Sequence, residues 1–180
     1  MIAIIDYDAG NTFNVQKALQ HIGLDAVLTA DRDTILAADG VILPGVGAYA
    51  SAVSVLRERG LIDVIHEVVA RNIPLLGICL GMQLLFDESE EYGPTPGLGI
   101  IPGTVKAIPN NLGLRVPHMG WNQNKLCRKD SVFSDVADKY TYFVHSYYVD
   151  TNSQYITTTV DYGIKVPGIV EKGNVYGMQF

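Results

Sequence analysis

Apolar residues form four short continuous runs in the first half of the chain. Each run has the length of a strand that is buried on both faces, and the runs occupy residues 1–6, 24–29, 40–43 and 73–78. Helical spacing of apolar residues separates them over residues 12–22 and again over residues 48–70, where Gly60 interrupts it. Strands that alternate with helices in this order predict a parallel sheet with helices on its faces.

The first helical segment has recognisable ends. Asn11 is a residue type that caps helix N-termini, and Gly23 is one that ends helices. Three- and four-residue spacing predicts a buried side made of Val15, Ala18, Leu19 and Ile22.

The second half of the chain has a different character. A glycine- and proline-rich loop at residues 93–99 is followed by short segments enriched in β-branched and aromatic residues, at residues 140–144, 155–160 and 168–170. We expect these segments to add antiparallel edge strands to the parallel half. Residues 1–180 contain no repeat or linker, so a single domain is expected.

Composition narrows the classes of function. The net charge is −6 without a cluster of Lys or Arg, which argues against nucleic-acid or membrane partners. No run reaches the roughly 18 apolar residues of a membrane span, and the N-terminus has no basic leader, so a cytoplasmic protein is expected. With only Cys79 and Cys127, the chain has no disulfide framework and no four-thiolate zinc site, and no metal or cofactor is predicted.

Cys79 lies where the apolar run changes from strand to helix spacing. Glycines two residues before and after it give Gly77-x-Cys79-x-Gly81, the thiol form of the nucleophile elbow, in which a sharp turn lifts the reactive atom above the sheet. We expect the helix N-terminus to stabilise a thiolate and the Leu80 N–H to face an oxyanion. The alternative is an inert buried cysteine.

Together with Pro44-Gly45-Val46-Gly47, the stretch from Gly77 to Gln83 resembles the elbow of the class I, triad-type glutamine amidotransferases. The resemblance implies a flavodoxin-like α/β fold, with a central, mostly parallel sheet flanked by helices and added antiparallel strands. It also implies that Cys79 attacks the side-chain amide of glutamine, forms a thioester and releases ammonia. The implied oxyanion and glutamine-binding residues are Gly45, Val46, Gly47, Leu80, Gln83, His145, Ser146 and Tyr147.

Three further segments narrow the resemblance: Asp6-Tyr7 with Gly10-Asn11, residues 116–122 and residues 143–149. They are similar to the glutaminases that supply ammonia to a (β/α)8-barrel cyclase making imidazole glycerol phosphate in histidine biosynthesis. The implied contacts with this partner are Asn11, Asn14, His118, Met119, Trp121 and Asn122. The alternative for Trp121 is a position in the core. The alternative for Asn11 and Asn14 is a helix cap or an ordinary position on the helix surface.

The resemblance implies a His-Pro-Glu sequence, with the general base, directly after Phe180. The printed sequence ends there, and its histidines, His21, His66, His118 and His145, do not stand in that position. We therefore expect a C-terminal segment to be missing, and little or no glutaminase activity from these 180 residues alone.

Other functions fit parts of the sequence. Gly45-Val46-Gly47-Ala48-Tyr49-Ala50 matches the G-x-G-x-x-A fingerprint of dinucleotide-binding modules, although it does not open the first strand–helix unit. A thiol hydrolase of another flavodoxin-like family would carry the same elbow. A catalytically dead partner subunit would lack the His-Pro-Glu sequence.

Overall fold

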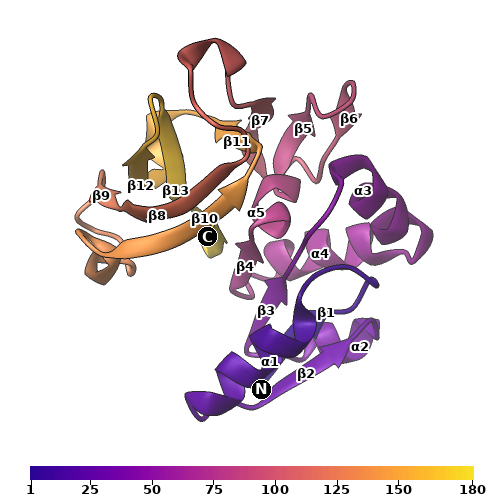
Figure 1. Cartoon of the computed structure of the whole chain (residues 1–180). Coiled ribbons are helices and arrows are strands. Elements are labelled where there is room, and N and C mark those ends of the chain that lie inside the picture. Colours follow the sequence, from indigo (N-terminus) through magenta and orange to yellow (C-terminus); the bar gives the residue numbers. More distant parts are fainter.

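The computed structural model describes residues 1–180, apart from the side chain of Leu112. Its central sheet has eight strands in the order β2-β1-β3-β4-β14-β13-β12-β9 (Figure 1). The first five strands in this order are parallel: β2 (Ala26–Thr29), β1 (Ile2–Ile5), β3 (Gly40–Leu43), β4 (Leu75–Ile78) and β14 (Val175–Met178). The other three strands continue the sheet in antiparallel pairs: β13 (Lys165–Lys172), β12 (Ile156–Asp161) and β9 (Lys125–Leu126).

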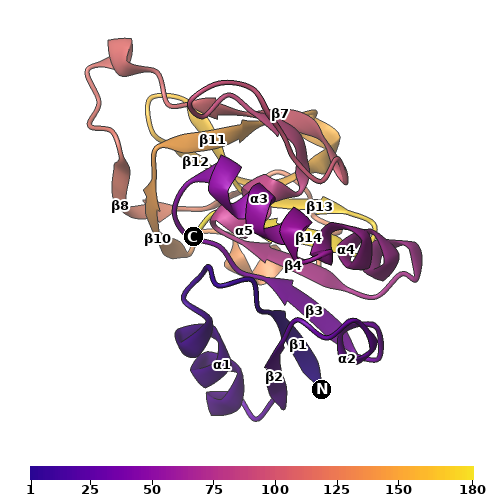
Figure 2. The ribbon, with the colours of Figure 1, turned by 90° about the vertical axis from the view of Figure 1, so that its right-hand side faces the viewer.

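Five α-helices connect and cover the parallel strands. They are α1 (Thr12–His21), α2 (Arg32–Leu36), α3 (Tyr49–Glu58), α4 (Leu61–Ala70) and α5 (Leu80–Leu84). Figure 2 shows α1 on one side of the sheet and α2, α3 and α4 on the other. Among the residues described, none of the helices combines the length and apolar character that a membrane crossing needs.

Two smaller sheets extend the second half of the chain. One is an antiparallel pair of β8 (His118–Gln123) and β10 (Tyr140–His145), called the ribbon below. The other has the order β11-β7-β5-β6, with β11 (Tyr147–Asp150), β7 (Ile101–Ala107), β5 (Phe86–Ser89) and β6 (Thr95–Pro96). Short 3-10 helices lie at Asn110–Leu112, Ser134–Val136 and Ser153–Tyr155.

The main core lies between the parallel strands and the helices α2, α3 and α4, which cover one side of the sheet. Strands β1 and β3 are buried along almost their whole length, as their uninterrupted apolar sequences predict. Leu56 of α3 and Ile65 and Val68 of α4 are fully buried in the same cluster. This packing fixes the carboxyl ends of β3 and β4, from which the site is built.

The predicted α/β architecture is confirmed, with three differences. Helix α1 forms as predicted, but its predicted buried side is not buried: Val15 and Leu19 are half-buried, Ala18 is exposed and Ile22 is 67% exposed, because α1 packs mainly beside the edge strand β2. Residues 140–144 were expected to add an antiparallel edge to the parallel half, but β10 pairs with β8 in the separate ribbon. Strand β14, to which the sequence assigned no position, is a central parallel strand between β4 and β13. The segment after β14 therefore ends beside the segment after β4.

Candidate active site

Cys79 connects β4 to α5 in a strained backbone conformation. Its φ of 55° and ψ of −113° lie in a region that residues with a side chain rarely adopt. The elbow predicted from the glycine spacing is thus present, and it holds the partly buried thiol at the carboxyl end of β4.

The surrounding glycines are required by close backbone approaches. A Cβ added to Gly81 would lie 1.9 Å from the carbonyl oxygen of Leu43, and one added to Gly77 would lie 2.6 Å from the carbonyl oxygen of Gly81. A Cβ at Gly45 would lie 2.7 Å from the backbone nitrogen of Gly81. Strand β3, strand β4 and helix α5 can therefore meet only because these positions carry no side chain.

The segment after β3 lies against the elbow, as predicted for an oxyanion site. Val46, Gly47 and Leu80 line the same pocket as Cys79, whereas Gly45 packs behind them against Gly81. The buried hydroxyl of Tyr7 donates a hydrogen bond of 2.7 Å to the carbonyl oxygen of Pro44, which anchors the start of this segment. The segment after β3 and the start of α5 thus line the same pocket as Cys79.

Burial raises the pKa of the Cys79 thiol above its ordinary value. Hydrogen bonds from the Leu80 backbone and from the Gln179 side chain oppose this effect in part. The Leu80 backbone at the start of α5 thus favours the thiolate, as expected, but desolvation of the thiol is the larger contribution to its pKa.

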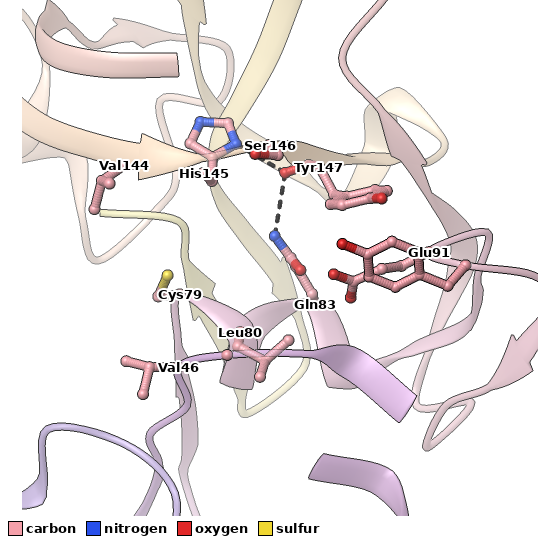
Figure 3. Close-up of a pocket in the computed structure, with 11 residues that line it drawn as sticks. Val46, Cys79, Leu80, Gln83, Glu91, Val144, His145, Ser146 and Tyr147 are labelled. Atoms are coloured by element: carbon pink, nitrogen blue, oxygen red, sulfur yellow. Dashed lines mark hydrogen bonds between the residues drawn. The ribbon is translucent and has the colours of Figure 1, made fainter. Parts of the chain in front are cut away.

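A pocket of ≈ 480 Å³ opens above the elbow (Figure 3). It brings together residues from four separate segments of the chain. The predicted residues that line it are Val46, Gly47, Cys79, Leu80, Gln83, His145, Ser146 and Tyr147.

Three residues that line the pocket were not identified from the sequence: Glu91, Tyr92 and Val144. Glu91 follows β5 and accepts a hydrogen bond of 2.8 Å from the Tyr49 backbone N–H, so its carboxylate is held in place. The acidic stretch at residues 88–91 was visible, but no spacing rule indicates which member turns inward. This choice is made by the packing of the loop against the start of α3.

Gln83 is buried, which excludes a solvent-exposed helix position as its role. Its amide nitrogen donates to the Tyr147 carbonyl oxygen at 3.1 Å and to the Gln179 side-chain oxygen at 3.0 Å. The Gln179 amide nitrogen in turn lies 3.8 Å from the Cys79 sulfur. Gln179, which the sequence did not single out, reaches the thiol because β14 runs parallel beside β4.

His145 has both ring nitrogens engaged. Nδ1 lies 2.8 Å from the Tyr147 carbonyl oxygen and Nε2 lies 2.9 Å from Nδ1 of His118. Burial lowers the pKa of His145 to about 4, and proximity to His118 adds to the effect. Among the described residues, neither histidine ring forms a hydrogen bond with the Cys79 thiol, whose side-chain partner is Gln179. His145 is therefore not assigned as the general base.

The exposed face of the ribbon carries the predicted partner residues Met119 and Trp121. Trp121 is 68% exposed and meets Tyr142 edge to face at 5.6 Å, so it is not the core residue considered as its alternative. Strand alternation adds Tyr140, Tyr142 and Val144 to this face, all exposed and all missed in the sequence.

The other predicted partner residues differ in exposure. Asn11 and Asn14 are exposed, and Asn11 stands at the N-cap of α1 without a capping bond from its side chain to the described residues. Asn122 is half-buried. His118 does not fit a direct partner contact because it is 0% exposed, with its ring stacked between Phe143 and Tyr162.

A second cavity of ≈ 210 Å³ reaches the same thiol from the side of α1. It shares Val46, Cys79 and Val144 with the first pocket, and its lining includes Asn11 and Tyr142. Cys79 therefore borders both the polar pocket and this second cavity, whose lining also includes Gln179 and Phe180.

Comparison with known families identifies the class of protein. Residues 3–180 match the model of the family "Glutamine amidotransferase class-I". The chain belongs to this family, which favours the amidotransferase interpretation over the dinucleotide-binding one.

Curated relatives define the resemblance more closely. The chain is 52% identical over 180 residues to the imidazole glycerol phosphate synthase subunit HisH of Lactiplantibacillus plantarum, covering 100% of this chain and 86% of that protein. It is 51% identical over 180 residues to the subunit of the same name from Streptococcus mutans, covering 100% of this chain and 90% of that protein.

Solved structures support the fold. A glutamine amidotransferase crystal structure aligns with a TM-score of 0.78 at 18% identity, covering 100% of this chain and 89% of that one. The glutaminase domain of Trypanosoma brucei CTPS with bound acivicin aligns with a TM-score of 0.62 at 20% identity, covering 99% and 84%.

Proposed function

We propose that the chain is the glutaminase subunit of an imidazole glycerol phosphate synthase, acting in the cytoplasm as one half of a heterodimer in histidine biosynthesis. It hydrolyses glutamine to glutamate and delivers the ammonia to a (β/α)8-barrel cyclase subunit. The observation that carries the proposal is the strained Cys79 elbow at the base of a polar pocket. The similarity of about half of all positions to HisH subunits supports the choice of pathway.

The chemistry follows from the placement of the thiol. The Cys79 sulfur, once deprotonated, attacks the side-chain carbonyl carbon of glutamine, and the oxyanion lies between the Leu80 N–H and the backbone at Val46 and Gly47. Collapse breaks the carbon–nitrogen bond, the nitrogen takes up the proton that the thiol released, and ammonia leaves, with a thioester remaining on the sulfur. Water then adds to the thioester, which releases glutamate and restores the thiol.

The polar end of the pocket suits the amino-acid head of glutamine. Glu91 is the carboxylate among the lining residues, and one of its oxygens is held by the Tyr49 backbone. The other oxygen is suited to accept from the substrate ammonium group, as a charge-assisted hydrogen bond. Gln83 has both amide protons engaged, so its side-chain oxygen is the atom it offers to a substrate donor.

The partner surface is proposed on the exposed face of the ribbon together with Asn11 and Asn14. Adjacent exposed aromatic side chains are typical of protein interfaces, and Trp and Tyr are the residue types that dominate their energy. The second cavity connects this side of the molecule with Cys79.

Covalent labelling tests the site. A glutamine analogue with an electrophilic ketone should add one label to the protein as its gene encodes it, in the presence of the cyclase. The Cys79→Ala variant should not be labelled. Cys127→Ala, which removes the exposed thiol, should still add one. Labelling that persists in Cys79→Ala and disappears in Cys127→Ala would refute the proposed site.

A further inference from the structure

Two histidines form a buried pair between the pocket and the ribbon. His118 on β8 and His145 on β10 stand directly opposite each other in the strand register, and Nδ1 of the first lies 2.9 Å from Nε2 of the second. Both rings are buried, and the ring of His118 also stacks on Phe143 and Tyr162. Neither ring touches the thiol within the described residues, so the pair has no direct part in the chemistry above.

On its inner side the pair connects to the pocket. The Tyr147 carbonyl oxygen lies 2.8 Å from Nδ1 of His145 and 3.1 Å from the Gln83 amide nitrogen, so both of its lone pairs are used. The same Gln83 nitrogen bonds to Gln179, whose amide nitrogen points at the Cys79 sulfur. The orientation of both glutamine side chains therefore depends on a carbonyl group that His145 holds.

On its outer side the pair connects to the ribbon strand. Nε2 of His118 lies 2.8 Å from the side-chain oxygen of Asn122, whose nitrogen donates to the Asp161 carbonyl oxygen at 3.1 Å. His118 and Asn122 are four residues apart on β8 and share its inner face, while Met119 and Trp121 project from the other face. The chain of hydrogen bonds thus begins on the strand that presents the exposed aromatic residues.

The directions of the central bonds follow from the groups involved. The Tyr147 carbonyl can only accept, so Nδ1 of His145 carries the proton. Burial lowers the pKa of both rings, which keeps His145 neutral at pH 7, and its Nε2 then accepts from Nδ1 of His118. When His118 is protonated, its far nitrogen donates to the Asn122 oxygen and the Asn122 nitrogen keeps its bond to the Asp161 carbonyl oxygen. When His118 is neutral, that nitrogen can only accept, so the Asn122 amide must turn its NH2 group toward the ring and give up the bond to Asp161.

We propose that His118 and His145 are positioning residues for glutamine hydrolysis, which transmit the placement of strand β8 through Tyr147 and Gln83 to Gln179 beside Cys79. The inference rests on the proposed function and deepens it. His145 also lines the pocket, but in this role both rings act through Tyr147 and Gln83. The pair keeps the Gln83 oxygen directed into the pocket and the Gln179 amide directed at the sulfur.

Substitutions at His118 separate hydrogen bonding from packing. His118→Phe keeps a ring between Phe143 and Tyr162 but removes both nitrogen contacts. His118→Asn keeps a donor where Nδ1 lies. We expect the Phe variant to lower kcat/KM for glutamine about 30-fold, with a fall in kcat, because Tyr147, Gln83 and Gln179 lose their fixed orientation. The Asn variant should recover most of the loss.

The assay uses the protein as its gene encodes it with its cyclase partner, and thermal unfolding confirms that each variant is folded. A folded Phe variant with kcat/KM within about twofold of wild type would overturn the proposal. An Asn variant no better than a folded Phe variant would also overturn it. If the wild type shows no Cys79-dependent hydrolysis, the proposed function fails instead, so the two failures are distinguishable.

A measurement on the wild type keeps the test independent of variant folding. Nitrogen-15 NMR of labelled imidazoles reports which ring nitrogen carries the proton. The proposal requires the Nδ1–H form of His145 at pH 7.5, bonded to the Tyr147 carbonyl oxygen. A predominant Nε2–H form would leave that carbonyl without a proton from His145 and would overturn the proposal.

Discussion

The parallel half of the central sheet and the ribbon hold opposite sides of one pocket by different means. On the side of β3, β4 and α5, backbone segments meet so closely that only glycine fits, and the nucleophile stands in a strained turn. On the ribbon side, hydrogen-bonded side chains and the register of two strands set the geometry. We call the first side the rigid half, because close backbone packing fixes the sulfur there. We call the ribbon side the polar half, because polar contacts hold its recognition groups and leave them adjustable.

The largest effect is expected from adding one methyl group to the rigid half. Gly81→Ala places its Cβ 1.9 Å from the Leu43 carbonyl oxygen, so β3 and α5 must separate. We expect a loss on the order of 4 kcal/mol in the free energy of unfolding, measured by urea denaturation. Gly23→Asn is the control, since a Cβ there meets no described atom within 4 Å and Asn tolerates a positive φ. Equal losses in the two variants would contradict the close-packing account.

The polar half should respond to pH instead. The folded pKa of His145 is lowered from 6.5 to about 4, so its ring stays neutral while the unfolded chain takes up a proton below pH 6.5. Stability is therefore lost as pH falls through this window, by about 2 kcal/mol from His145 between pH 7.5 and 5. His145→Asn should lose correspondingly less over the same interval in urea titrations. An unchanged pH dependence in the variant would show that the ring titrates normally in the folded protein.

The exposed face of the ribbon should matter for assembly and not for folding. Trp121→Ala should weaken binding of the cyclase about 30-fold, or about 2 kcal/mol, because exposed aromatic residues at interfaces carry much of the binding energy. Calorimetric titration measures this loss. Val132→Ala, at an exposed position outside the ribbon, is the control and should bind normally. Equal affinity of Trp121→Ala and wild type would remove this face from the interface.

The smallest effect concerns substrate recognition at Glu91. Glu91→Gln keeps an oxygen for the Tyr49 N–H but removes the charge that would bind the ammonium group of glutamine. We expect KM for glutamine to rise about tenfold with little change in kcat. Glu90→Gln, at an exposed neighbour, should leave both constants unchanged. A fall in kcat alone would assign Glu91 a role in the reaction step rather than in binding.

The rigid half could be predicted from the sequence because its constraints are local. The glycines around Cys79 and the change from strand to helix spacing lie within a few neighbouring residues, and the elbow was found as predicted. The burial of Val15, Ala18, Leu19 and Ile22 was predicted wrongly, because spacing gives a helix its apolar side but not the extent of the surface that covers it.

On the ribbon side, the resemblance named Gln83, His145, Ser146 and Tyr147, and all four line the pocket. Their hydrogen bonds could not be predicted, because these bonds join distant segments. His118 and His145 are 27 residues apart and meet only through the register of β8 with β10. Gln83 and Gln179 are 96 residues apart and meet because β14 inserts beside β4. Residue types alone do not reveal such pairings, and a lone histidine or glutamine has many ordinary roles in a sequence.

Steady-state release of glutamate tests the central claim most directly. The protein as its gene encodes it, assayed with its cyclase partner, should hydrolyse glutamine, and Cys79→Ala should lower the rate by about a thousandfold or more. Cys127→Ala should match wild type, because its thiol is exposed and outside the pocket. Glutamate release that survives in folded Cys79→Ala would contradict the assignment of this sulfur as the nucleophile.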